Sequence, residues 1–129
     1  MADIDSYLKS LGARLGERVE VPFKSVSISE WRPMPRCCHA NVDCWVSGQT
    51  GRKALRGWLI DGTDGLDGFL VVAHSVVDEC GELYDITPRD GSPLNPNERR
   101  WFLRHNGTTE EFDAMPKPPS HWVSRTRRG

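Results

Sequence analysis

The sequence lacks a long hydrophobic run and carries almost no net charge. No apolar segment approaches the ~20 residues that a membrane-spanning helix needs, and the first residues, from Met1 to Asp5, show neither the basic region nor the apolar core of a signal peptide. The formal net charge of −1 argues against a general nucleic-acid binder and a membrane-surface protein. We therefore expect a cytoplasmic protein with no nucleic-acid or membrane partner, and no feature of the sequence predicts an oligomeric state.

Metal-binding and disulfide motifs are also missing. The 4 cysteines include no Cys-x-x-Cys pair, and in a reducing compartment such thiols stay free or act as ligands. The aspartate-rich segment 61–68 lacks the glutamate that closes an EF-hand loop, so a plain hairpin loop is expected there. No metal and no cofactor is predicted.

Length and composition suit a single domain. A chain of 129 residues with 37% hydrophobic content is long enough to bury one core. Apolar periodicity and turn residues predict helices over 3–15, 38–47 and from Thr108 onward, and strands over 25–29, 54–60, 69–77, 82–87 and 100–105. The predicted fold is an α+β domain over residues 1–122, with an antiparallel sheet of about four strands packed on a central helix, then a flexible basic tail over 123–129.

The segment 36–46 places a cysteine at the start of this central helix. Prolines interrupt the chain just before it, so a helix can begin at the cysteines. Cys38, Val42 and Trp45 repeat at helical spacing and share one face, whereas His39 is expected at the solvent-facing rim. A thiol on the first turn lies near unpaired backbone N–H groups and the positive end of the helix dipole, which favour the thiolate. Cys38 is therefore a candidate nucleophile.

A second segment carries one histidine on a predicted strand. Residues 69–77 are apolar and mostly β-branched, apart from His74 and the serine that follows it, which predicts a buried strand. The turn 78–81 begins with Asp and ends with Gly, as a type I turn prefers, and residues 82–87 form the return strand. This hairpin is the candidate source of a general base and of its carboxylate partner.

The register of the hairpin decides whether these two groups meet. With Glu79 and Cys80 as the central turn residues, His74 lies directly across from Asp85, with Cβ atoms roughly 4.5–5.5 Å apart. A bulge at Gly81 instead slips the register by one residue and turns Asp85 to the opposite face. Both registers stay open at the level of sequence.

The order of a cysteine on a helix start, a histidine on a following strand and an aspartate on the next strand resembles the transglutaminase-like and papain-like cysteine enzymes. Segments 74–77 and 84–88 are similar to the His…Asp-Pro-Thr hairpin of the transglutaminase core, and the resemblance covers roughly residues 31–88. It implies Cys38 as nucleophile, His74 as general base and acid, and Asp85 as the residue that orients the imidazole.

The resemblance is less complete at the oxyanion donor. Papain-like proteases carry an oxyanion-hole Gln a few residues before the cysteine, whereas Trp31 and Arg32 stand there in this chain. The expected oxyanion donors are the Cys38 amide together with Arg32 or Asn41. Trp31, Arg32 and Asn41 are thus the candidate oxyanion or substrate-binding residues.

The predicted activity is thiol-dependent acyl transfer on an amide, as in a peptidase, a glutamine deamidase or a transglutaminase-like enzyme, with a protein or peptide as substrate. Two alternatives remain. The first is a non-catalytic interaction module in which Cys38 and His74 are core residues. The second is a small zinc-binding domain, because zinc takes four soft ligands. Its candidate ligands are Cys37, Cys38, His39, Cys44 and Cys80.

Overall fold

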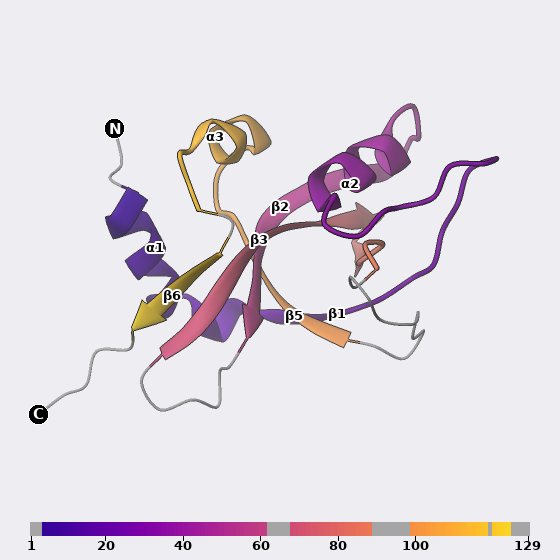
Figure 1. Cartoon of the computed structure of the whole chain (residues 1–129). Coiled ribbons are helices and arrows are strands. Elements are labelled where there is room, and N and C mark those ends of the chain that lie inside the picture. Colours follow the sequence, from indigo (N-terminus) through magenta and orange to yellow (C-terminus); the bar gives the residue numbers. More distant parts are fainter. Residues whose placement is uncertain (1–3, 62–67, 89–98, 119, 125–129) are drawn as a thin grey trace, which may run out of the picture.

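The computed structural model describes residues 4–61, 68–88, 99–118 and 120–124 as an α+β fold, with a mostly antiparallel sheet of six strands and three helices (Figure 1). The helices are α1 (Ile4–Ala13), α2 (Cys38–Val46) and α3 (Thr109–Ala114), and a 3-10 turn follows α1 at Leu15–Glu17. The strands are β1 (Val19–Pro22), β2 (Arg52–Asp61), β3 (Gly68–Glu79), β4 (Glu82–Tyr84), β5 (Arg99–Arg104) and β6 (Ser120–Ser124). The sheet therefore has more strands than the four expected from the sequence.

The sheet closes on itself beside the end of β4. Its strands run in the order β1, β5, β2, β3, β4, and a parallel bridge between Phe23 and Asp85 joins the chain after β4 to the chain after β1. The Asp85 amide donates to the carbonyl of Pro22 at 2.8 Å, and the Lys24 amide donates to the carbonyl of Asp85 at 2.8 Å. Two backbone hydrogen bonds thus fix the position of Asp85.

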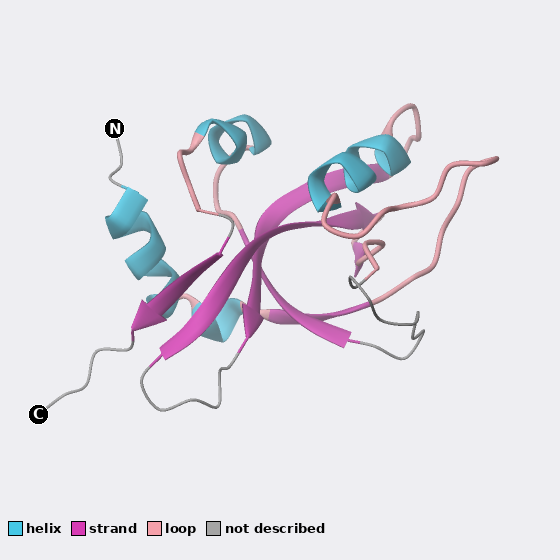
Figure 2. Cartoon of the chain, in the orientation of Figure 1, coloured by secondary structure: helices cyan, strands magenta, loops and turns pink. Residues whose placement is uncertain are grey.

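One edge of β3 is left without a strand partner at its middle. β2 pairs with the opposite edge along most of the strand. The edge in question pairs with β6 through residues 68–72 and with β4 through residues 77–79. Residues 73–76 lie between these partners, and no strand among the described residues pairs with them there. The helix α2 packs over this part of the sheet, as Figure 2 shows.

Apolar side chains from all three helices pack on the sheet. Leu8 and Leu11 of α1 and Phe112 of α3 are buried in one cluster with Trp58 of β2 and Phe69 of β3. Full burial of such side chains contributes roughly 1.5–3 kcal/mol each. A second cluster holds α2 in place, and it consists of Val42, Trp45, Val77, Tyr84 and Ile86.

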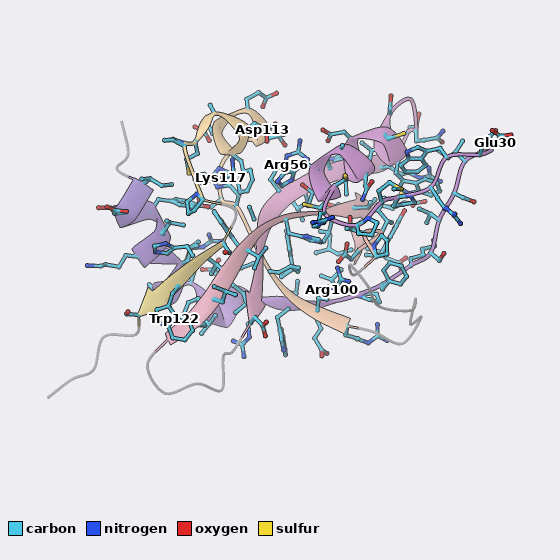
Figure 3. All side chains as sticks on the ribbon, in the orientation of Figure 1. Glu30, Arg56, Arg100, Asp113, Lys117 and Trp122 are labelled. Carbon is cyan, nitrogen blue, oxygen red and sulfur yellow. The ribbon has the colours of Figure 1, made fainter. Side chains whose placement is uncertain are left out.

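Arg56 of β2 ties α2 and α3 to the sheet. Its side chain is only 4% exposed, and its guanidinium donates to both carboxylate oxygens of Asp43 on α2, at 3.1 and 2.9 Å. It also donates to both carboxylate oxygens of Asp113 on α3, at 3.0 and 3.3 Å. Figure 3 shows Arg56 beside Asp113, between the two helices. Two bidentate ion pairs thus fix the orientation of both helices, because the planar guanidinium matches each carboxylate geometrically.

Several predicted elements are confirmed. A helix begins at Cys38, the strands around 54–60 and 69–77 pair antiparallel, and Thr108 forms a capping box with Glu111 at the start of α3. The first helix is also present, as α1. Residues 62–67 of the predicted aspartate-rich hairpin loop lie outside the described residues.

A predicted strand and the predicted start of the tail are wrong. Residues 25–29 do not form a strand, because their alternating pattern has no partner strand and Ile28 only bridges to the nearby Trp31. The edge strand is instead β1, which ends at Pro22. The predicted tail from 123 starts too early, since Val123 is buried and pairs with Phe69 of β3. In the described part of the chain, no helix has the length and apolar character required to span a membrane.

Candidate active site

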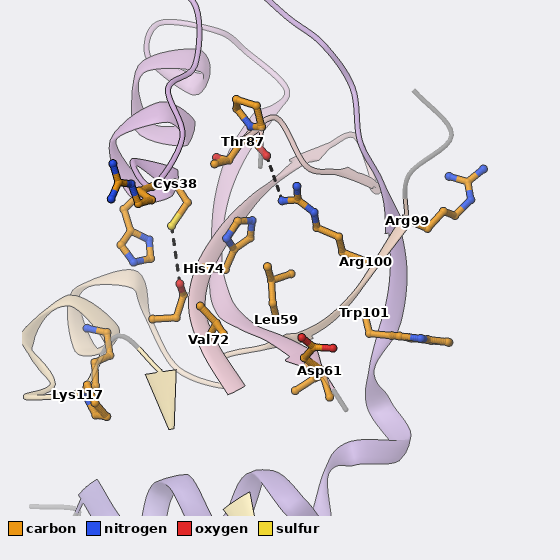
Figure 4. Close-up of a pocket in the computed structure, with 16 residues that line it drawn as sticks. Cys38, Leu59, Asp61, Val72, His74, Thr87, Arg99, Arg100, Trp101 and Lys117 are labelled. Carbon is orange, nitrogen blue, oxygen red and sulfur yellow. Dashed lines mark hydrogen bonds between the residues drawn. The ribbon is translucent and has the colours of Figure 1, made fainter. Parts of the chain in front are cut away.

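A cavity of about 970 Å³ lies between the start of α2, the middle of β3 and the first residues of β5 (Figure 4). Its wall includes Cys38, His74, Thr87 and Arg100, and apolar side chains such as Leu59 extend the wall along β2. A cavity of this size is in the range of ligand-binding sites in proteins. It brings the two reactive side chains predicted from the sequence to a common surface.

Cys38 is the first residue of α2, and its sulfur faces the unpaired stretch of β3. The helix has Cys37 as its N-cap residue, with no side-chain capping hydrogen bond. The sulfur of Cys38 lies 3.8 Å from the carbonyl oxygen of Ala73, and its side chain is partly buried. The amide groups of a first helical turn have no intrahelical acceptor, so they and the helix dipole place positive potential at this thiol.

His74 and Asp85 form a buried hydrogen-bonded pair. His74 Nε2 lies 3.0 Å from Asp85 Oδ2, and the two side chains are 6% and 0% exposed. Arg100 Nη1 donates to the same carboxylate oxygen at 2.6 Å and to the carbonyl of Thr87 at 3.0 Å. The Thr87 amide donates to Asp85 Oδ1 at 3.1 Å. Asp85 is thus fixed from three sides, and because Nε2 is engaged, Nδ1 of His74 is left for the thiol.

The hairpin register differs from both registers considered for the sequence. Val77 pairs with Tyr84 and Glu79 with Glu82, so the central turn residues are Cys80 and Gly81. Both have positive φ, 53° and 94°, as in the type I′ turns that connect tight hairpins. The predicted type I turn with Glu79 and Cys80 at its centre is therefore wrong, because Cys80 adopts a left-handed conformation.

Asp85 still reaches His74 despite this register. The observed pairing is displaced by two residues from the first predicted register, and a displacement of two keeps every side chain on its face of the sheet. His74 and Asp85 are not partners in the β3 and β4 ladder, which ends at Tyr84. Beyond Tyr84 the chain leaves β3 and joins the chain after β1 at Phe23, which carries the Asp85 carboxylate under the imidazole.

The charges in this group favour a thiolate beside an imidazolium. Burial raises the pKa of the Cys38 thiol, but interactions with His39 and His74 outweigh burial and lower the pKa to about 6. Burial lowers the pKa of His74, whereas the charge and hydrogen bond of Asp85, assisted by Cys38, raise the pKa to about 9. Burial raises the pKa of Asp85, but His74 and Arg100 hold it below its usual range. Between about pH 6 and about pH 9, Cys38 and His74 form an ion pair.

The long contact between the Cys38 sulfur and the Ala73 carbonyl is a hydrogen bond only when Cys38 is a protonated thiol. A thiol can donate to a carbonyl, but a thiolate has no proton to donate. Because the pKa of Cys38 is lowered to about 6, the sulfur is ionised at neutral pH. The Ala73 carbonyl, 3.8 Å away, then lies near the thiolate without a hydrogen bond. The imidazoles of His39 and His74 are the hydrogen-bond partners of the sulfur.

His39 is a second imidazole at the sulfur and not the solvent-facing rim residue expected from the sequence. The ring is partly buried and packs edge-on against Phe112, with ring centroids 5.7 Å apart. Its Nδ1 lies 2.6 Å from Ser75 Oγ. Cys38 therefore lies between two imidazoles, one oriented by Asp85 and the other by Ser75.

The hydrogen bonds around Ser75 determine which ring nitrogen of a neutral His39 carries the proton. Ser75 is fully buried, and its oxygen accepts a hydrogen bond from Arg56 Nη1 at 2.9 Å. Its own hydroxyl proton is then available to Nδ1 of His39. With Nδ1 as the acceptor, a neutral His39 carries its proton on Nε2 and can donate it to the sulfur. No sequence motif indicated His39 as a partner of Cys38, because His39 meets Ser75, and Ser75 meets Arg56, only in the folded protein.

The three predicted oxyanion or substrate-binding residues do not line this cavity. Asn41 is buried and uses its amide to hold the preceding loop, because it exchanges hydrogen bonds with the backbone of Met34 and donates to Thr87 Oγ1. Arg32 borders a smaller separate pocket, and Trp31 bridges to Ile28. Of the oxyanion donors expected from the sequence, the Cys38 amide alone is placed beside the sulfur.

The cysteines and histidines are not grouped as metal ligands. Cys37, Cys44 and Cys80 are exposed and unpaired by disulfides. In the parts of the chain that the structure describes, no group of three or more His, Cys, Asp or Glu side chains could hold a metal ion. The geometry thus gives the zinc alternative no ligand set.

Comparison of the chain with protein-family models, with curated proteins and with solved structures found no match.

Proposed function

We propose that this protein is a thiol-dependent acyl-transfer enzyme that acts on an amide, with Cys38 as nucleophile, His74 as general base and acid, and Asp85 as the residue that orients His74. The observation that carries the proposal is the buried His74 and Asp85 pair beside a half-buried thiol whose pKa is lowered to about 6. An ordinary cysteine has a pKa of about 8.5 and is mostly protonated at neutral pH. Preparing a thiolate in a cavity is what nucleophilic catalysis requires.

The proposed reaction begins with the ion pair. The sulfur of Cys38 forms a bond to the substrate carbonyl carbon, and the carbonyl oxygen becomes an oxyanion beside the amide groups of the first turn of α2. The C–N bond then breaks, and Nδ1 of His74 gives its proton to the leaving amine. Water attacks the thioester, His74 takes a proton from that water, and the S–C bond breaks to release the acid. An amine in place of water would make the same site a transferase.

The resemblance to transglutaminase-like and papain-like enzymes supports the same proposal. In both cases a helix supplies the cysteine, a following strand the histidine, and the next segment the aspartate, and here these come from α2, β3 and the chain after β4. We propose that the fold has this core, with a protein or peptide as substrate. A cytoplasmic location is part of the proposal, because a reducing compartment keeps such a thiol active.

An acyl-enzyme assay tests the proposal without knowledge of the substrate. Reaction with p-nitrophenyl acetate at about pH 7 should release p-nitrophenol and leave one acetyl group on Cys38, located by peptide mass spectrometry. Release should continue beyond one equivalent as His74 directs water to the thioester. The variant Cys38→Ala should lose the reaction, and His74→Ala should accumulate slowly formed acyl enzyme.

The exposed cysteines serve as controls within the same molecule. Cys44 and Cys80 are more exposed to solvent than Cys38, so acylation governed by solvent access alone would favour them. Acetylation spread over all cysteines, with no turnover, would identify the non-catalytic interaction module in place of the enzyme. The variant Cys44→Ser should retain full turnover.

A further inference from the structure

Among the described residues, the wall of the cavity is mostly basic, although the whole chain has a formal net charge of −1. Its basic side chains are Arg36, Arg99, Arg100 and Lys117, and its single acidic side chain among the described residues is Asp61. The charges of the protein are thus unevenly distributed. A cleft lined by charges of one sign raises the local concentration of ligands of the opposite sign.

These basic groups differ in what already binds them. The Arg100 guanidinium is committed to Asp85 by an ion pair of 2.6 Å, so its charge is largely used within the site. The Lys117 ammonium donates to the carbonyls of Phe112 and Met115 and lies 4.2 Å from the centre of the Phe112 ring. Lys117 forms no close ion pair with a carboxylate among the described residues, although the charge of Asp113 on α3 acts to raise its pKa. Arg99 is exposed, on the side of the cavity opposite α2.

The basic groups flank a largely apolar surface. Leu59, Val72 and Trp101 line the cavity between Lys117 and Arg99, and Figure 4 shows these side chains below His74, with Asp61 among them and the two basic residues on either side. A ligand that fits this surface would combine an apolar chain with a negative charge some distance from the reacting carbon. Carboxylates pair with both arginine and lysine.

From this arrangement we infer that the cavity selects an acyl substrate bearing a carboxylate, held by Lys117 or Arg99 while Cys38 attacks the amide. The inference rests on the proposed function and adds the chemical class of its substrate. A glutamate or aspartate side chain in a peptide and a small dicarboxylic acid amide share this chemistry.

The rate of Cys38 alkylation by an anionic and a neutral reagent tests the inference. Iodoacetate carries a carboxylate and iodoacetamide does not, while both alkylate a thiolate. The ratio of their rates at Cys38, divided by the same ratio for 2-mercaptoethanol, should exceed one at low salt. It should fall toward one as salt approaches roughly 0.5 M, because the Debye length is about 10 Å at 0.1 M and shortens further.

Two variants locate the effect. In the double variant Arg99→Gln and Lys117→Gln the normalised ratio should fall by roughly fourfold, since a unit charge about 10 Å away in a high dielectric changes such a rate by about twofold. The matched control is Arg104→Gln, on the same strand as Arg99, exposed and outside the cavity wall. That control should leave the ratio unchanged. The single variant Arg99→Gln, at an exposed side chain, covers the case in which the loss of Lys117 perturbs α3.

The outcomes separate this inference from the proposed function. Slow labelling of Cys38 by neutral iodoacetamide at about pH 7 overturns the proposed function itself. Fast labelling with a normalised ratio of one, unaffected by the variants, overturns only the carboxylate site. Protection of Cys38 from iodoacetamide by acetyl-tetraglutamate amide or by glutarate supports the site and distinguishes a peptide from a small dicarboxylate. Acetyl-tetraglutamine amide is the uncharged control, and equal protection by it counts against the inference.

Discussion

The carboxylate of Asp85 accepts a hydrogen bond from His74 Nε2 at 3.0 Å, although the two residues are not partners in the β3 and β4 ladder. The contact depends on the closure of the sheet, where the backbone of Asp85 bonds to Pro22 and Lys24. The orientation of the imidazole is therefore fixed by an edge strand far away in the sequence. A hairpin alone would not hold it.

The alkylation rate of Cys38 should depend on pH with an apparent pKa of about 6, because the interactions with His39 and His74 lower the pKa of the thiol to that value. At about pH 6.5 the iodoacetamide rate should exceed that of free cysteine about fivefold, after allowance for the lower nucleophilicity of a less basic thiolate. The rate should level off above about pH 7, and peptide mapping should place the label.

Removal of the imidazole should shift this profile. In His74→Ala the apparent pKa of Cys38 should rise, since the charge and hydrogen bond of His74 contribute to its depression. The control His121→Ala changes a histidine of β6 that does not line the cavity and should leave the profile as it is. An unshifted profile in His74→Ala would contradict the ion pair.

Asp85→Asn should lower the stability of the fold and should also make the thiolate form of Cys38 less favourable. The amide removes a buried carboxylate that pairs with Arg100 at 2.6 Å, and breaking a buried ion pair at one partner costs about 3–5 kcal/mol. Without the anion the pKa of His74 should fall, because Asp85 is the main group that raises it. Urea unfolding and NMR titration of His74 measure the two effects.

The comparison for this variant is Asp43→Asn. Asp43 also pairs with a buried arginine, but its side chain is 53% exposed and Arg56 keeps its second partner, Asp113. The expected loss is below about 1 kcal/mol. Similar losses in the two variants would show that burial of the Asp85 ion pairs is not what stabilises the site.

Ser75→Ala should raise the pKa of Cys38, although the substitution leaves Cys38 itself unchanged. Ser75 holds Nδ1 of His39, so its loss frees the ring and weakens the hydrogen bond from Nε2 to the thiolate. A hydrogen bond to a charged group contributes about 1.5–3 kcal/mol, which corresponds to roughly one to two units of pKa. The alkylation profile measures the shift, and His39→Ala should show a similar one. Ser47→Ala, at the exposed C-cap of α2, should show none, and an unchanged profile in both site variants would exclude His39 from the thiolate environment.

The sequence predicted the parts of the site that local patterns determine. The prolines before Cys38 and the apolar spacing through Trp45 indicate the helix and its first residue, and the β-branched run around His74 indicates the strand. The face on which Asp85 lies stayed open, because a slip of one residue at Gly81 would have turned it away from His74, and the observed displacement of two residues keeps it on the predicted face. These features depend only on residues close together in the chain.

The rest of the site is made by contacts between distant segments. Arg100 comes from β5, so its meeting with Asp85 depends on strand order, and Arg56 meets Ser75 through the register of β2 and β3. β1 and β6 are short and lack a strong apolar alternation, and prolines stand in or near both. Since neither strand was predicted in full, neither the closure at Asp85 nor the edge partner of β3 could be derived from the sequence.

The Cys38 and His74 pair should contribute almost nothing to the pH dependence of the stability of the wild-type protein. Between about pH 6.5 and about 8.5 the folded pair holds one proton, on His74, whose pKa is raised to about 9. The unfolded chain also holds one proton in this range, on the thiol, because free histidine titrates near 6.5 and free cysteine near 8.5. Equal numbers of bound protons mean that the two contributions cancel.

Cys38→Ser should remove this cancellation. His74 in the folded variant still has a raised pKa because of Asp85, whereas the unfolded chain loses the histidine proton near pH 6.5 and has no thiol at this position. The folded state then binds more protons, so stability is fully present below about pH 6.5 and falls as pH rises toward the pKa of His74, by at most about 1.4 kcal/mol per unit. Urea unfolding of both proteins over this range measures the difference, with Cys44→Ser as the control at an exposed thiol. Parallel stability curves for Cys38→Ser and wild type would show that His74 is not protonated in the fold.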